Sequence, residues 1–426
     1  MNEHKKKHNH IPEGWHWKTL GEIALVGPNN GIFKRRQDFG EGAPLLNVAD
    51  LYKSLKVDTT TLERVKVTDA ELKKHAVQPG DLFFCRSSLK RDGIGWCCYA
   101  DEISEPTVFE CHVMRIRPNP KLADSKYLAH YWQYPDVRNE IISKSKTATM
   151  TTMNQADLSE VIIPLPPLNE QKRIAAILDK AYALREKRRQ AICKLNSLTQ
   201  SAFIQVYGDP VTNPKKWKMG MLGDVIFAAK DGPHVSPSYT NSGIPFLSTR
   251  HIRPGQVVWE DLKYISKEDA KIYWKKCKPV RGDILYTKGG TTGIAKAIDF
   301  DNEIAVWVHV AVLKTNHEVV DPLWLEHMLN SSYCYTQSQR YTHGIANHDL
   351  GLTRMVKIQI YIPPLQNQKE FSRWIVKART LLTKQSQSLS ILNGLFHSLQ
   401  QRAFSGKLFN NEIDEMKQLV EVGANG

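Results

Sequence analysis

The sequence lacks several features that would identify a membrane or secreted protein. It has no apolar run long enough to span a bilayer, and no apolar stretch follows the basic N-terminal segment, so we expect neither a transmembrane helix nor a secretory signal. The seven cysteines are odd in number and scattered, without a Cys-x-x-Cys pair. This usage is typical of reduced thiols and gives no zinc spacing, so we expect a cytoplasmic protein.

The usual motifs of nucleic-acid enzymes are also missing. There is no Asn-Pro-Pro-aromatic tetrapeptide of a methyltransferase, and the Gly-rich run 288–293 has no lysine directly after its second glycine, as a P-loop requires. Glu71 and Lys73, with Asp50 as a possible partner upstream, resemble part of a metal-dependent nuclease site, although a charged helix face explains Glu71 and Lys73 without any metal. His112 and His309 occupy equivalent places, but without a duplicated partner they are interpreted as structural. We expect no catalytic residue and no metal or cofactor of the chain's own.

Charge of one sign is in excess. The net charge is +14 and the sequence pI is near 9.3, which favours a polyanionic partner, and nucleic acid more than membrane.

One long amphipathic segment occurs twice. Pro166-Pro167-Leu168 and Pro363-Pro364-Leu365 each open a stretch whose apolar residues recur at alternating steps of three and four, with an offset of 197 between the copies. This spacing predicts two long helices, the first from about 169 to 206, packed as an antiparallel coiled coil. The predicted helix interface comprises Ile174, Ile177, Leu184, Arg188 and Leu195 with Phe371, Trp374, Leu381, Gln385 and Leu392.

Full overlap of the two helices gives a specific register. It would place Ile174 near Leu399, Ala202 near Phe371, and Arg188 beside Gln385 in the middle of the coil. A polar pair there would select the register at a cost in stability.

A block of about 150 residues precedes each long helix, and the blocks resemble one another. Leu82–Cys85, Ile284–Thr287 and the runs that follow them are rich in β-branched and aromatic residues, and helical patterns occur at 125–134 and 322–330. The predicted fold class is therefore α+β, with two mixed blocks and two long helices. The predicted boundaries are 1–163, 164–208, 209–361, 362–408 and a polar tail, 409–426.

Basic and hydroxyl residues gather on irregular segments of both blocks. Arg can bind guanine or phosphate bidentately, and Ser, Thr and Gly-rich backbone suit phosphate oxygens. The candidate DNA-binding residues are Lys34, Arg35, Arg36, Arg86, Ser87, Ser88, Lys90, Arg91, Thr149 and Thr151 in the first block, and Arg250, His251, Arg253, Lys288, Thr291, Thr292, His343, Asn347 and His348 in the second.

The repeated Pro-Pro-Leu-x-x-Gln-Lys at 166–172 and 363–369 resembles the specificity subunit of type I restriction–modification systems, as do the segments 207–210 and 403–408. The resemblance implies a non-catalytic subunit in which each block is a target recognition domain for one half of a bipartite DNA site. It also implies two modification subunits that use S-adenosylmethionine to methylate adenine, and restriction subunits that use ATP and Mg. A magnesium-dependent nuclease, or a scaffold that bridges DNA without a methylation partner, remains an alternative.

Overall fold

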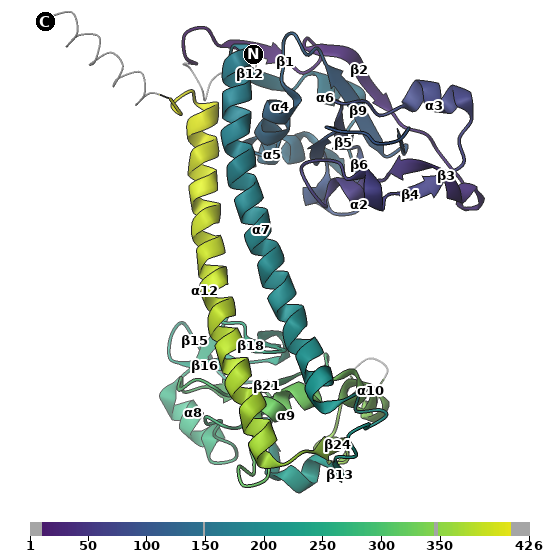
Figure 1. The fold of residues 1–426 in the computed structure, drawn as a ribbon. Helices are drawn as coiled ribbons and strands as arrows, with labels where there is room; N and C mark the ends of the chain where they lie inside the picture. The colour runs from purple at the N-terminus through teal and green to yellow at the C-terminus, as the bar shows by residue number, and fades with distance from the viewer. Residues whose placement is uncertain (1–10, 148–149, 345–347, 410–426) are drawn as a thin grey trace, which may run out of the picture. The chain divides into compact units, whose positions relative to one another are not determined.

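The structure is a computed structural model that describes residues 11–147, 150–344 and 348–409. The chain divides into two compact units, residues 1–188 with 388–426 and residues 189–387. Each unit therefore contains part of both long helices, α7 (Leu168–Tyr207) and α12 (Leu365–Phe404) (Figure 1). The tail from residue 410 onward lies outside the described residues.

The first unit is built on a four-stranded antiparallel sheet with smaller sheets beside it. The main sheet has the order β2-β9-β5-β7, namely Ala24–Asn30, Val113–Pro118, Leu82–Cys85 and Cys97–Tyr99. The others are β4-β3-β8 (Glu63–Val65, Phe39–Leu46, Val108–Phe109), β10-β11-β6 (Lys146–Thr147, Thr151–Thr152, Ser87–Ser88) and β1-β12 (His16–Thr19, Ile162–Leu165). Its short helices are α2 (Val48–Leu51), α3 (Asp69–His75), α4 (Ser125–Trp132), α5 (Pro135–Lys144) and α6 (Gln155–Ser159).

The second unit repeats this plan. Its main sheet has the order β14-β23-β20-β21, namely Ile226–Asp231, Val310–Thr315, Ile284–Thr287 and Ala295–Ala297. The others are β15-β19-β16-β22 (Tyr239–Thr240, Lys263–Ile265, Ile244–Leu247, Ala305–Val306), β17-β18 (Ile252–Arg253, Gln256–Val257) and β13-β24 (Lys218–Met221, Gln359–Ile362). Its short helices are α8 (Lys267–Trp274), α9 (Pro322–Leu329), α10 (Ser332–Tyr341) and α11 (Leu352–Met355).

The predicted duplication and the α+β class are confirmed, with one difference in the strands. The apolar run 306–313 predicts a single strand, but in the structure it contains the end of β22 and the start of β23, which belong to different sheets. The first unit makes the same break between β8 and β9. An apolar run carries no signal of where a chain changes sheets, because both strands are buried.

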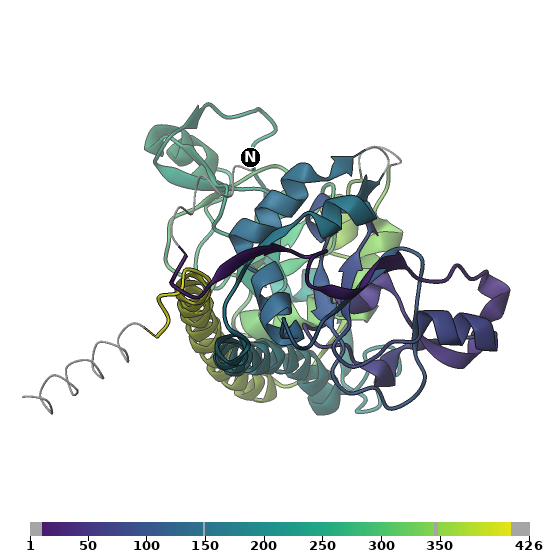
Figure 2. The same cartoon turned by 90° about the horizontal axis from the view of Figure 1, so that it is seen from above.

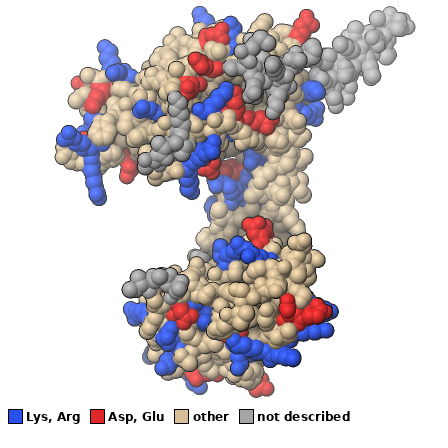
Figure 3. Space-filling view, turned by 180° about the vertical axis from the view of Figure 1, so that it is seen from behind, with Lys and Arg blue, Asp and Glu red and all other residues tan. Residues whose placement is uncertain are grey.

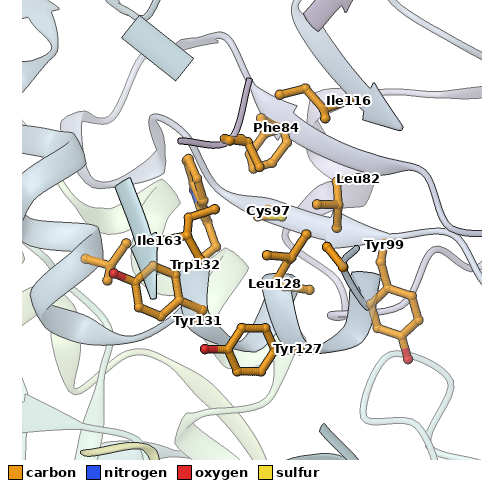
Figure 4. Close-up of a cluster of buried hydrophobic side chains, with 14 of the residues drawn as sticks. Leu82, Phe84, Cys97, Tyr99, Ile116, Tyr127, Leu128, Tyr131, Trp132 and Ile163 are labelled. Atoms are coloured by element: carbon orange, nitrogen blue, oxygen red, sulfur yellow. The ribbon is translucent and has the colours of Figure 1, made fainter. Parts of the chain in front are cut away.

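The core of the first unit lies between the main sheet and α4 (Figure 4). Phe84 from β5 meets Trp132 from α4 edge-to-face, with ring centroids 4.6 Å apart. Leu178 of α7 and Phe404 of α12 join the same cluster, so both long helices contribute to the core of this unit.

Within each unit the two long helices run antiparallel. In the first, Arg185 Nε donates to Asn393 Oδ1 at 2.9 Å, and Figures 1 and 2 show the end of α12 beside the start of α7. In the second, Tyr207 OH donates to the carbonyl of Asn367 at 2.9 Å, and the rings of Phe203 and Phe371 are 5.5 Å apart.

The helix interface differs from the predicted one. Leu184 and Leu381 are 49% and 46% exposed. Tyr182 packs against Phe396 and not against Ile391, the residue that the predicted register would place opposite it. The reason is that the buried face of each helix also covers α4 or α9, which shifts the apolar stripe away from a two-helix seam.

The remaining predicted interface residues vary in burial. Ile174 and Phe371 are buried, Ile177, Leu195 and Leu392 are half-buried, and Trp374 is 40% exposed. The pairing of Arg188 with Gln385 remains a prediction.

A buried glutamine attaches each long helix to its unit. Gln171 Nε2 donates to the carbonyls of Leu122 and Pro166 at 3.0 and 2.8 Å, and its Oε1 accepts from the Asp124 amide at 2.8 Å. Asp124 in turn caps α4 by accepting from the Tyr127 amide. Because the side chain is fully buried and bonded at both ends, it fixes the start of α7 against the start of α4.

The second unit repeats the arrangement. Gln368 Nε2 donates to Val319 and Pro363, and its Oε1 accepts from the amide of Asp321, the cap of α9. The glutamine of the duplicated Pro-Pro-Leu-x-x-Gln motif thus joins the start of a long helix to the start of a short one, α4 or α9, by hydrogen bonds.

We expect Gln171→Ala or Gln368→Ala to lower the free energy of unfolding by about 2–4 kcal/mol, because each leaves buried donors and acceptors without a partner. Denaturant unfolding of the full chain measures the change. Gln366→Ala is the matched control, since Gln366 is exposed and its side-chain amide donates to Glu370 on the helix surface. Equal effects of the three substitutions on the free energy of unfolding would contradict an anchoring role for the two buried glutamines.

Candidate nucleic-acid interface

Three segments of the first unit meet at one end of the main sheet. The Ile32 amide, after β2, donates to Phe109 at 2.8 Å, and the Arg86 amide, after β5, donates to His112 at 2.8 Å. Met153 then donates to the carbonyl of Arg86 at 3.0 Å, next to the β6–β11 pairing. The segments that carry most of the candidate DNA-binding residues of this unit are therefore held together by backbone hydrogen bonds.

The second unit brings the equivalent segments together. The Lys288 amide donates to His309 at 2.8 Å, Leu350 donates to Lys288 at 2.7 Å, and Gly290 donates to His348 at 3.0 Å. The loop after β20 and the segment before α11 thus form one surface, although 50 residues or more separate them in the chain.

Close backbone approach at this end requires glycine in both units. A Cβ atom built on Gly31 would lie 1.9 Å from the carbonyl oxygen of Phe109, and one on Gly232 would lie 1.9 Å from that of Val306. Any larger residue would push the loop off the sheet edge.

The side chains of the first unit divide into exposed and buried sets. Lys34 pairs with Glu71 at 2.8 Å, and Arg86 is half-buried with one guanidinium nitrogen 3.4 Å from the carbonyl of Cys111. Arg35, Arg36, Lys90 and Arg91 are exposed, whereas Ser87, Ser88 and Thr151 are buried in strand pairing. Thr149 lies outside the described residues.

The second unit shows a similar division. Arg250 is exposed but donates to the carbonyl of Asp261, and the imidazole of His251 is buried and accepts from the Ser248 amide at 2.9 Å. Thr292 is buried with its hydroxyl 3.0 Å from that of Thr342. Arg253, Thr291, His343 and His348 are exposed, and Asn347 lies outside the described residues.

Lys288 differs most from the expectation. It is 7% exposed, and its ammonium lies 3.1 Å from Asp349 and 3.5 Å from Asp231. Burial raises the pKa of Asp231, but the ammonium groups of Lys276 and Lys288 outweigh it and hold that pKa below its ordinary value. Lys288 therefore joins β14, the loop after β20 and the 343–350 segment from within, where the sequence suggested a lysine facing DNA.

His112 and His309 also differ from the structural role expected of them. Both are exposed at the break between two strands, and their backbone carbonyls, rather than their imidazoles, hold the loops. The ring of His309 occupies the space beside Gly289, where a Cβ would lie 2.1 Å from Nδ1.

The residues of the nuclease alternative do not form a metal site. Asp50 accepts from the Asn47 amide at the start of α2 and pairs with Lys53, whereas Glu71 caps α3 and pairs with Lys34. Within the described residues, the group of side chains whose spacing would suit a metal ion is Glu110, Cys111 and His112. This group includes none of Asp50, Glu71 and Lys73.

In the face shown in Figure 3, Lys and Arg side chains are scattered among Asp and Glu over the surface.

No helix among the residues that the structure describes is both long and apolar enough to cross a membrane.

The two similar units, each with a loop after β5 or β20 that is held by backbone hydrogen bonds, define a protein with two recognition domains. The family model for the type I restriction modification DNA specificity domain matches residues 12–194 and 214–387. The chain belongs to this family.

Similar proteins agree with this assignment. The chain is 22% identical to the Escherichia coli type I restriction enzyme EcoBI specificity subunit, over 92% of this chain and 86% of that protein. It is 24% identical to a putative type I restriction enzyme MjaX specificity subunit from Methanocaldococcus jannaschii, over 85% and 86%. The fold resembles the type I restriction–modification S subunit from M. genitalium, with a TM-score of 0.58, 13% identity, and coverage of 93% and 97%.

Replacing Lys288 tests its role as an internal clamp. We expect Lys288→Ala to destabilise the second unit by about 1–3 kcal/mol, because Asp231 and Asp349 lose the buried ammonium while Asp231 keeps its ion pair with Lys276. We also expect the salt dependence of DNA binding to keep its slope, whereas loss of a phosphate contact would lower it by about one. Adding Asp231→Asn should restore part of the stability, and Lys230→Ala, on the exposed side of β14, is the control.

The carboxylate of Asp231, held mainly by the ammonium of Lys276 and also by that of Lys288, predicts a pH dependence of stability. Because the folded-state pKa of Asp231 is depressed, its contribution is present above the unfolded-state pKa and is lost as the pH falls through the folded-state pKa. Unfolding of Asp231→Asn followed across this acid range should show a smaller loss of stability than the wild type.

Proposed function

We propose that this chain is the DNA-reading subunit of a type I restriction–modification complex and recognises a bipartite site, one half through each unit. The observation that supports this most directly is the repetition of one loop framework with different side chains. Arg86 to Arg91 in the first unit corresponds to Lys288 to Thr292 in the second, on equivalent strands and against equivalent partner segments.

The proposed domain boundaries follow the sequence. Residues 1–163 and 209–361 would be the target recognition domains, and residues 164–208 and 362–408 the helical spacers. The proposed DNA contacts are the exposed cations Arg35, Arg36, Lys90, Arg91 and Arg253, together with the exposed His343 and His348. Base edges specify the sequence, while phosphate contacts fix the position of the protein.

Catalysis would belong to partner subunits. We propose that two modification subunits supply adenine methylation with S-adenosylmethionine, and that restriction subunits supply ATP- and Mg-dependent cleavage. The chain itself would bind no cofactor. Co-purification of two methyltransferase subunits separates this assignment from a DNA-bridging scaffold, and cleavage by the purified chain with magnesium alone would favour the nuclease alternative.

Exchanging one unit tests modular reading. Replacement of residues 20–160 by the equivalent residues of a relative with a different specificity should alter one half of the methylated sequence and leave the other half unchanged. Genome-wide mapping of methylated adenines gives both halves at once. A change in both halves, or in neither, would contradict one half-site per unit.

Lengthening the helices tests whether they set the spacing. Insertion of about four residues, one helical turn, at matched positions of α7 and α12 should lengthen the unspecified spacer between the half-sites. The same mapping experiment measures it. An unchanged spacer with intact methylation would show that the long helices do not measure the distance.

A further inference from the structure

A single leucine at the tip of the loop after β5 is almost fully exposed. Leu89 is 83% exposed, more than any other large hydrophobic side chain of the described residues. Exposed Lys90 and Arg91 follow it directly. A single exposed leucine is ordinary on a protein surface, so its meaning depends on the loop that carries it and on the cations beside it.

The loop that carries Leu89 is fixed at its base. The guanidinium of Arg138, itself buried, donates to the carbonyls of Ile94 and Asp92 at 2.8 and 2.6 Å. Tyr52 donates to Gly93 at 3.1 Å, and the Lys90 amide donates to the Ser88 hydroxyl at 3.2 Å. A loop held in this way cannot easily turn Leu89 into the core, and it would lose little conformational entropy on binding.

The tip exists only in the first unit. The loop closes where Gly95 donates to Cys85, and in the second unit where Gly293 donates to Thr287. Ten positions separate the first pair and six the second, so the first loop is four residues longer. The second loop has glycine and threonine in this region and no apolar side chain.

We propose that Leu89 is a specificity-determining residue that contacts the 5-methyl group of a thymine in the half-site read by the first unit. This proposal rests on the proposed function. The cations beside Leu89 suit the phosphates of duplex DNA, and the thymine methyl is the apolar group that base edges offer in the major groove. The second unit, without such a tip, would read its half-site by polar contacts.

A double substitution in protein and DNA tests the contact. The full chain with its modification subunits is titrated with duplexes that carry the site found by methylation mapping, each thymine of the half-site being replaced in turn by deoxyuridine. We expect Leu89→Ala to weaken binding about tenfold. At one thymine, deoxyuridine should weaken the wild type by a similar factor and have no further effect on Leu89→Ala.

Leu25→Ala provides the matched control. Leu25 is also exposed, at 62%, but it lies near the start of β2, where its neighbour Ala24 pairs with Pro118. The candidate DNA-binding segments lie near the other end of this strand, after Asn30. Neither substitution should change the denaturation midpoint, because neither side chain is buried, and Leu25→Ala should keep wild-type affinity on every duplex.

Several outcomes would overturn the proposal. These are an unchanged affinity of Leu89→Ala, an equal loss on specific and random duplexes, and effects of deoxyuridine that add to that of Leu89→Ala at every thymine. A rise in fluorescence of 2-aminopurine placed in the half-site, abolished by Leu89→Ala, would assign Leu89 to unstacking and not to a methyl contact. If the wild type bound the site and random DNA equally well, the proposed function itself would be contradicted, and with it the contact of Leu89.

Discussion

The junction between each long helix and its recognition unit depends on one buried amide. Gln171 and Gln368 each satisfy two carbonyls and one amide at a point where three segments begin or end. A hydrogen-bond network that is fully satisfied in a dry interior is rigid, because any displacement leaves a polar group unpaired. The orientation of each unit on its own stretch of helix is therefore set by chemistry that the two copies share, while the loops are free to differ.

The loops can differ because their ends are anchored through the backbone. The segments after β2 and β5 are bonded through the main chain to the end of β8 and to the segment that joins β8 and β9. In the second unit, main-chain bonds hold the segment after β20 to the segment that joins β22 and β23 and to the residues before α11. Main-chain bonds place few demands on side-chain identity, except for the glycines at 31 and 232. Arg86 and Lys288 can thus occupy equivalent backbone positions and do different things, one near the surface and one as an internal clamp.

Much of the architecture could be predicted from the sequence, and the reasons for the failures are physical. The long helices, α4 and α9, and the strands β5, β7 and β9 with their counterparts β20, β21 and β23 were predictable because periodicity, composition and duplication mark them. The edge strands β2 and β14 were not predicted, because their sequences, with Gly, Pro, Asn, Lys and Asp, lack the composition of a strand. Which face of a long helix is buried was not predictable, since α4 and α9 compete with the other long helix for the apolar stripe, as the exposure of Leu184 and Leu381 shows. The sequence indicated where the candidate site lies, but it could not distinguish the exposed residues of the site from the buried ones. Composition cannot tell exposed Arg91 from buried Lys288, whose partners Asp231 and Asp349 come from distant segments.

The division of the long helices between the units has a consequence for synthesis of the chain. The second unit is continuous, residues 189–387, whereas the first needs residues 388–409 to supply Phe396, Ala403 and Phe404 to its core. At about 5–20 residues per second, a ribosome takes roughly 10–40 s to pass from the end of the first segment to the start of the last. The N-terminal unit, although translated first, therefore completes its core last.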